Sequence, residues 1–189
     1  LTSRQGQLAT FDLLTTTTNY NFVVVAASGS GKSFLTNEIV ADFLSRGGIA
    51  RIIDVGRSYA RFCSIMGGEN VVFSPDNPLS INPFTGIDTE QQLNELMPML
   101  KDLLRLMAYP LTTEQDTPPY QYQLFEKAIR EAWLQYQDDC ELRHVVEWLQ
   151  DYKDASDAAA RASDLALQLE LYSHGRYKRW FSGRRTVSF

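Results

Sequence analysis

The chain has 189 residues, of which 44% are hydrophobic and 22% are charged, and its formal net charge is −5. This composition supplies one packed domain or slightly more, and it excludes a disordered polyelectrolyte, a membrane-spanning helix and bulk attraction to nucleic acid or anionic lipid. Its two cysteines, Cys63 and Cys140, exclude a disulfide framework and a cysteine-rich zinc site, and they indicate a reducing, cytoplasmic setting.

Residues 1–87 show the alternating pattern of an α/β domain. Helical spacing of apolar residues predicts helices at residues 33–46 and 57–65, each stopped by a pair of glycines. Compact, β-branched runs are typical of strands buried on both faces of a parallel sheet. Such runs predict three strands, at residues 21–27, 49–55 and 71–73.

Residues 88–175 are predicted to form an all-helical subdomain. Apolar residues recur at three- and four-residue spacing along four segments, residues 89–107, 120–137, 141–152 and 156–172. Pro98 falls inside the first segment, where it should kink or restart the helix. We interpret the Leu and Met stripe of that segment as a core face, and residues 110–119 as a loop. Residues 176–189 are predicted to return toward the core.

A phosphate-binding loop follows the first predicted strand. Residues 26–33 read A-A-S-G-S-G-K-S, which fits the Walker A pattern with Ala26 in place of the usual first glycine. Backbone N–H groups of such a loop, together with the N-terminus of the next helix, form a cradle for phosphate. Lys32 is the catalytic candidate, bridging the β- and γ-phosphates of ATP, and Ser33 is the candidate Mg²⁺ ligand. The residues expected to contact the nucleotide are Ala27, Ser28, Gly29, Ser30, Gly31, Lys32, Ser33 and Phe34.

The carboxylate that such ATPases need is harder to place. Asp54 ends the second predicted strand, but Val55 follows it where a catalytic Glu is often found. Asp54 therefore either takes part in the site or caps the turn that follows, and the sequence leaves both open. Residues 1–10 have no secretory-signal pattern, and Leu1 is not a methionine, so we interpret the chain as a piece of a longer protein. We expect the Walker B carboxylate and the arginine finger beyond Phe189.

Several motifs together resemble the TraC-type ATPases of F-like conjugative type IV secretion systems. They are residues 19–35 (NYNFVVVAASGSGKSFL), 53–59 (IDVGRSY), 66–68 (MGG), 81–84 (INPF) and 175–183 (GRYKRWFSG). The resemblance implies a RecA-like P-loop sheet interrupted by a helical subdomain, in which Lys32 and Ser33 match the P-loop positions. It further implies a hexamer that acts at the cytoplasmic face of the inner membrane with other secretion-system components.

The function predicted from this resemblance is an ATPase that powers pilus assembly and substrate transfer, with pilin or a nucleoprotein as the transferred substrate. The chain alone is expected to bind nucleotide better than it hydrolyses it. One alternative is a DNA-translocating coupling ATPase, which should show nucleic-acid-stimulated hydrolysis. Another is a nucleotide-gated scaffold that binds ATP to order an assembly and turns over negligibly.

Other polar residues are weaker candidates. Arg57 and Arg61 can reach a phosphate, but we expect them to be solvated or paired with carboxylates. Residues 176–185 interleave basic and aromatic side chains, a pattern that suits either single-stranded nucleic acid or a strand edge; we favour the strand edge because the net charge is acidic. His144 and His174 have no companion at metal-ligand spacing, and His174 is expected at a helix end.

Overall fold

A computed structural model describes residues 6, 19–74, 76–77, 79–111, 118–154 and 157–187. The chain divides into two compact units, Leu1–Asn70 and Val71–Phe189. The domain boundary predicted after residue 87 lies inside the second unit. Apart from Gly6, the segment assessed for a secretory signal lies outside the described residues, and so does most of the loop predicted at 110–119.

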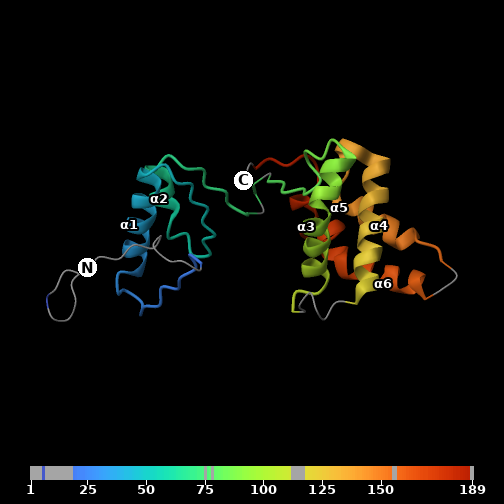
Figure 1. The fold of residues 1–189 in the computed structure, drawn as a ribbon, viewed down its shortest axis with the longest axis horizontal. Coiled ribbons are helices and arrows are strands. Elements are labelled where there is room, and N and C mark those ends of the chain that lie inside the picture. Colours follow the sequence, from blue (N-terminus) through green and yellow to red (C-terminus); the bar gives the residue numbers. More distant parts are fainter. Residues whose placement is uncertain are drawn as a thin grey trace. The chain divides into compact units, whose positions relative to one another are not determined.

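The first unit contains the two helices that the sequence predicts (Figure 1). Helix α1 is Lys32–Ser45 and helix α2 is Ala60–Ile65. Both end in turns whose glycines, Gly47 and Gly67, have positive φ angles of 82° and 71°. Glycine adopts this left-handed conformation at little cost, which explains why each helix stops where its glycine pair begins.

The predicted parallel sheet is wrong for the part of the chain that the structure describes, because that part contains no β-strand. The three apolar runs have irregular backbone, and none of their described side chains is fully buried: Val23 is 85% exposed, Ile53 is 98% exposed, and Val71 is half-buried. A buried parallel strand needs a neighbouring strand to complete its hydrogen bonds and helices to cover both of its faces. Among the described residues these three runs find neither, so their β-branched composition produces no ladder.

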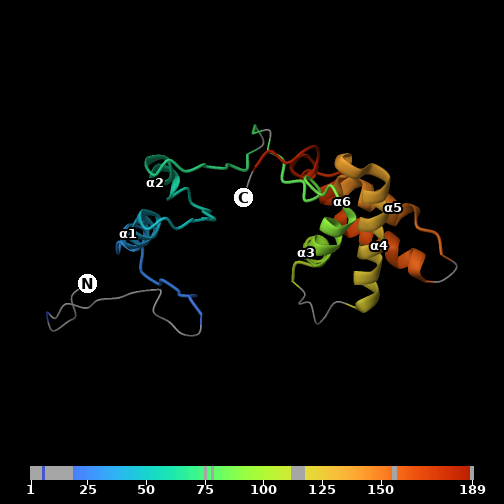
Figure 2. The same cartoon turned by 45° about the horizontal axis from the view of Figure 1, so that its top comes forward.

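The second unit is a helical bundle (Figure 2). Its α-helices are α3 (Glu90–Ala108), α4 (Pro119–Tyr136), α5 (Leu142–Asp151) and α6 (Ala158–Ser173). A short 3₁₀ helix, η2 (Gln137–Asp139), lies between α4 and α5, and another, η3 (Lys178–Trp180), follows α6. Helix α3 packs on α4 and α6, and α5 packs on the same two helices. Each helix therefore turns an apolar stripe toward one shared core, as its spacing predicts.

Helix α3 shows how these boundaries arise. Thr89 accepts a hydrogen bond from the Gln92 N–H, and the Gln92 side chain accepts one from the Thr89 N–H, which completes a capping box. The helix runs through Pro98 as one element and does not restart there. Pro98 is exposed, and so is Asn94, whose carbonyl loses its helical partner, so water can satisfy that carbonyl. The expected core face is confirmed, since Leu93 and Leu100 are fully buried.

The two ends of the second unit are held together by a buried amide. Asn82 is 2% exposed, and its Nδ2 donates to the carbonyl oxygens of Cys140 and Gly183, each at 2.9 Å. Its Oδ1 accepts from the Phe84 N–H at 3.2 Å. Beside it, the Thr186 N–H donates to the Ser80 carbonyl at 3.0 Å. The segment that enters the bundle and the segment that leaves it therefore lie side by side.

Replacing Asn82 with Ala should lower the free energy of unfolding of the second unit by about 2–4 kcal/mol, because it leaves buried carbonyls without donors and opens a cavity. All three tryptophans of the chain, at positions 133, 148 and 180, lie in this unit, so urea unfolding followed by tryptophan fluorescence measures it directly. Exposed Asn70, in the first unit, provides the matched Asn→Ala control. A loss no larger than the control's would contradict the role given to the amide.

Candidate functional site

The loop between the first apolar run and α1 contains two left-handed glycines. Gly29 has φ 77°, and Gly31, the N-cap of α1, has φ 89° and ψ 11°. The Ser30 N–H donates to the Ala27 carbonyl at 3.2 Å, which closes the turn, and the Leu35 N–H donates to the Gly31 carbonyl at 3.0 Å, which starts the helix. The backbone therefore turns tightly and enters α1 within a few residues.

This geometry brings the predicted site residues together at one helix N-terminus. Lys32 and Ser33 are the first two residues of α1, and their side chains are exposed. The first N–H groups of a helix have no partner within it and carry partial positive charge, which favours an anion. Cβ atoms built on Gly29 and Gly31 would lie in open space, so the approach to the loop is clear. These features fit a Mg²⁺-bound polyphosphate, while the individual contacts remain predictions.

Asp54 is used by the turn that follows it. Its Oδ1 accepts from the Gly56 N–H at 3.0 Å and its Oδ2 accepts from the Tyr59 N–H at 2.8 Å. Of the two interpretations left open by the sequence, these bonds favour the capping carboxylate. Arg57, inside this turn, has a positive φ of 56°, and its side chain is exposed, as is that of Arg61.

The sequence analysis gave Tyr59 no role, yet the structure joins it to the phosphate loop. Its hydroxyl lies 2.7 Å from Thr36 Oγ1, in the second turn of α1. In the motif at residues 53–59, the sequence drew attention to Asp54 and Arg57, and Tyr59 entered only through the family resemblance. A contact between residues 23 positions apart depends on how the chain folds back, so spacing alone could not reveal it.

The basic, aromatic segment near the C-terminus packs on the bundle. It contains η3 and then bends, and no strand occurs in its described part, residues 176–187, so the favoured strand edge is not found. Phe181 is buried in the core, and the Tyr177 and Trp180 rings stack with their centroids 5.3 Å apart. The guanidinium of Arg176 lies over the Tyr177 ring, 4.6 Å from its centroid. These contacts show that the aromatic side chains of this segment pack against the bundle and against one another.

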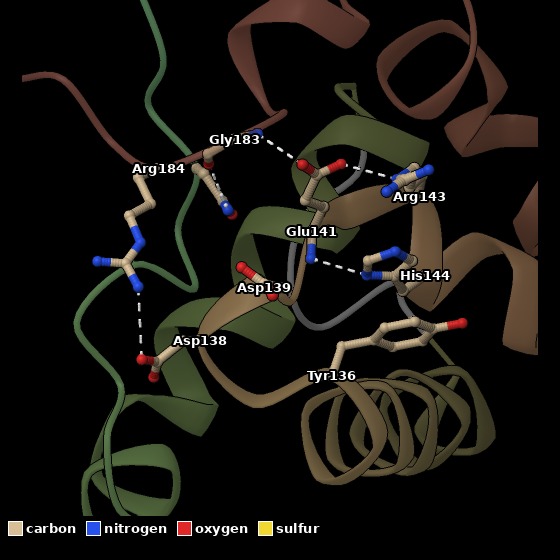
Figure 3. Close-up of a pocket in the computed structure, with 9 residues that line it drawn as sticks. Tyr136, Asp138, Asp139, Glu141, Arg143, His144, Gly183 and Arg184 are labelled. Carbon is tan, nitrogen blue, oxygen red and sulfur yellow. Dashed lines mark hydrogen bonds and ion pairs between the residues drawn. The ribbon is translucent and has the colours of Figure 1, made fainter.

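A hollow of about 310 Å³ opens between η2, the start of α5 and the return segment (Figure 3). Four of its charged groups form two ion pairs: Arg143 Nε lies 2.8 Å from Glu141 Oε2, and an Arg184 nitrogen lies 3.5 Å from Asp138. The Gly183 N–H donates to Glu141 Oε1 at 2.6 Å. We interpret this hollow as a joint between segments of the bundle.

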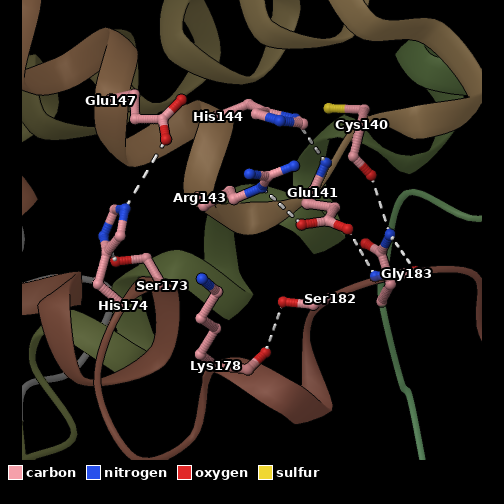
Figure 4. A network of polar contacts seen from close by, with 11 residues as sticks. Cys140, Glu141, Arg143, His144, Glu147, Ser173, His174, Lys178, Ser182 and Gly183 are labelled. Carbon is pink, nitrogen blue, oxygen red and sulfur yellow. Dashed lines mark hydrogen bonds and ion pairs between the residues drawn. The ribbon is translucent and has the colours of Figure 1, made fainter.

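His144 is part of this joint (Figures 3 and 4). Its ring stacks on Tyr136 with centroids 3.6 Å apart, and its Nδ1 accepts from the Glu141 N–H at 3.1 Å. Burial, followed by the positive charge of Arg143, lowers its pKa below the ordinary value of 6.5. His174 is the C-cap of α6, as expected, with its Nε2 3.7 Å from Glu147 Oε1.

The described residues offer neither a metal site nor a membrane span. In that part of the chain, no group of three or more His, Cys, Asp or Glu side chains could hold a metal ion. No described helix has the length and apolar character needed to cross a bilayer.

The Cys140 thiol is buried, which raises its pKa to about 12 and leaves it chemically inert.

Comparison with known proteins gives the family. The family model described as the TraG P-loop domain matches residues 11–152, well over half of the chain. The chain belongs to the TraG P-loop domain family. It is also similar to Protein TraC of Escherichia coli (strain K12), with 29% identity over 188 residues, which confirms the resemblance drawn from the sequence. That match covers 94% of this chain and 20% of the relative, so the chain spans about a fifth of that protein's length. No solved structure matches the chain.

Replacing Gly31 with Ala should weaken the start of α1, because alanine at φ 89° costs about 1 kcal/mol although nothing obstructs its Cβ. We expect amide hydrogen exchange in the first turn of α1 to become about fivefold faster. Gly56→Ala is the matched control, since Gly56 has no positive φ and the added Cβ would meet Ser58 Oγ at an ordinary 3.5 Å. Equal exchange rates in both variants would contradict the left-handed constraint.

The lowered pKa of His144 makes the second unit sensitive to pH. As pH falls below about 6.5, the unfolded chain takes up a proton on this imidazole before the folded chain does, so the free energy of unfolding should fall between pH 7.5 and pH 5. His144→Gln keeps an acceptor at the same capping position, as Gln92 does in α3, but does not titrate. Tryptophan-monitored unfolding should therefore show a shallower pH slope for this variant. Identical pH slopes for the variant and the unmodified chain would show that His144 does not cause the pH dependence of stability.

Proposed function

We propose that this chain binds Mg²⁺-ATP through residues 26–33 and is the nucleotide-binding part of a conjugation ATPase. The observation that carries the proposal is the start of α1 at Lys32, directly after two left-handed glycines. That turn leaves N–H groups and a lysine at one exposed helix N-terminus, inside the residues that match the TraG P-loop domain. Charge, backbone geometry and family all point to a polyphosphate ligand at this loop.

Each residue has a defined task in this proposal. The loop N–H groups from Gly29 to Lys32 hold the β-phosphate, and Lys32 Nζ neutralises the β- and γ-phosphate oxygens as charge develops. Ser33 Oγ, one position along the helix, holds the magnesium ion, which orients the phosphates and lowers their charge. In the reaction, water attacks the γ-phosphorus, the bond from that phosphorus to the β–γ bridging oxygen breaks, and ADP, inorganic phosphate and a proton are released.

Hydrolysis requires a carboxylate that this loop does not supply. Asp54 is the nearest candidate in the sequence, and both of its oxygens already accept backbone N–H groups. A carboxylate committed to a turn is poorly placed to orient a water molecule. We therefore propose that the chain alone binds ATP better than it hydrolyses it.

The wider role is part of the same proposal. We propose that the protein acts as a hexamer, peripheral to the inner membrane on its cytoplasmic side, together with other secretion-system components. There it powers pilus assembly and the transfer of pilin or a nucleoprotein. The similarity to Protein TraC and the TraG P-loop match support this assignment. A DNA-translocating ATPase and a nucleotide-gated scaffold are the alternatives, distinguished by DNA-stimulated hydrolysis and by binding without turnover.

Calorimetric titration of the chain with Mg²⁺-ATP tests the proposal. We expect saturable binding that Lys32→Ala weakens at least tenfold, because a charge-assisted contact to phosphate is lost. Ser33→Ala should remove most of the dependence of affinity on Mg²⁺. Lys153→Ala is the matched control, since Lys153 is an exposed lysine of the second unit. Equal affinities of the Lys32 and Lys153 variants would contradict the assignment.

A further inference from the structure

A polar contact reaches the first turn of α1 from outside the phosphate loop. Thr36 Oγ1 lies 3.1 Å from the Lys32 carbonyl and 3.2 Å from the Ser33 carbonyl. The Tyr59 hydroxyl lies 2.7 Å from the same Thr36 oxygen. Two hydroxyls thus connect Tyr59 to the backbone of the two residues that are expected to hold phosphate and Mg²⁺.

Either hydroxyl can donate in the contact between Tyr59 and Thr36, and the carbonyls that Thr36 also faces favour one of the two arrangements. A threonine hydroxyl has one proton, and both carbonyls that Thr36 faces are acceptors only. With that proton directed to the carbonyls of Lys32 and Ser33, the Tyr59 hydroxyl is the donor to Thr36 Oγ1. Removing the Tyr59 hydroxyl therefore removes one donor and leaves the bond from Thr36 to the helix in place.

Tyr59 is itself held by local contacts. Its N–H donates to Asp54 Oδ2 at 2.8 Å, and the Gly56 N–H donates to the other oxygen of the same carboxylate at 3.0 Å. Its carbonyl accepts from the Cys63 N–H at 2.8 Å, in the first turn of α2. Asp54 therefore fixes the turn from which the Tyr59 side chain reaches α1.

The start of α1 has few other restraints. Its N-cap, Gly31, has no side chain to accept a hydrogen bond, and no acidic residue lies in its first turn. None of its side chains is fully buried. A helix whose side chains are at most partly buried depends strongly on each tertiary contact that it makes. The bond from Tyr59 is such a contact, and it acts one turn from Lys32.

We propose that Tyr59 is a positioning residue for the phosphate loop. Through Thr36, its hydroxyl restrains the first turn of α1, so that the Lys32 ammonium and the Ser33 hydroxyl are already placed when Mg²⁺-ATP arrives. Asp54 supports this role by fixing the turn that carries Tyr59. The inference rests on the proposed nucleotide-binding function. It adds a residue outside the Walker A motif that raises the affinity for Mg²⁺-ATP by positioning the loop.

The test compares Mg²⁺-ATP affinity among variants of the chain by calorimetry. Tyr59→Phe removes only the hydroxyl and should weaken binding about three- to tenfold, which is the net effect of one hydrogen bond. Thr36→Val should weaken binding by a similar factor, whereas Thr36→Ser, which keeps the hydroxyl, should retain the affinity of the unmodified chain. The double variant should be no weaker than Thr36→Val alone, because both changes break one connection. Tyr20→Phe, at an exposed tyrosine of the same unit, is the matched control.

The titrations are made at a temperature at which circular dichroism shows every variant to be fully folded, so that a loss of stability alone leaves the affinity unchanged. Amide exchange in the first turn of α1 gives a second measurement, and it should become faster in Tyr59→Phe without nucleotide. Unchanged affinity and unchanged exchange in Tyr59→Phe, with binding still lost in Lys32→Ala, would overturn the positioning role alone. Failure of the unmodified chain to bind would overturn the proposed function and this role together.

Discussion

The helical unit depends on the buried side-chain amide of Asn82. Its nitrogen bonds to carbonyls of Cys140 and Gly183, which are 58 and 101 residues away along the chain. Figure 4 shows the Cys140 and Gly183 side of this joint, where Glu141 also accepts from the Gly183 N–H. One amide thus links three segments: the one that enters the bundle, the turn before α5, and the one that follows α6. Buried polar groups of this kind specify a single arrangement because every alternative leaves them unpaired.

The nucleotide-binding unit is organised in a different way. No residue of helix α1 is fully buried, and its first turn is positioned by the backbone geometry at Gly29 and Gly31 together with hydroxyl and carboxylate bonds. Such bonds are individually modest and directional, so they set the orientation of the loop more than its stability. A ligand that pairs with the exposed N–H groups and with Lys32 would add the interactions that this unit lacks, and so stabilise it by mass action.

The two units also differ in how far the sequence predicts them. The helices from residue 89 onward are found within a few residues of their predicted bounds, because an amphipathic stripe and local caps such as Thr89 determine each helix by itself. The parallel sheet was wrong, because a strand needs partners and the apolar run around Val23 finds none in the described chain. For the candidate site, the glycines and Lys32 were recognisable from local spacing. The contact of Tyr59 with Thr36 depends on tertiary folding and was not.

The most direct test of the account is to follow backbone amide resonances while Mg²⁺-ATP is added to the chain. The account predicts that the largest shifts fall on the N–H groups from Gly29 to Ser33, because these groups would donate to phosphate oxygens. Smaller shifts should reach Thr36 and Tyr59 through the contact between them. Shifts confined to the helical unit, or an unperturbed loop at saturating nucleotide, would contradict the assignment of this loop as the phosphate site.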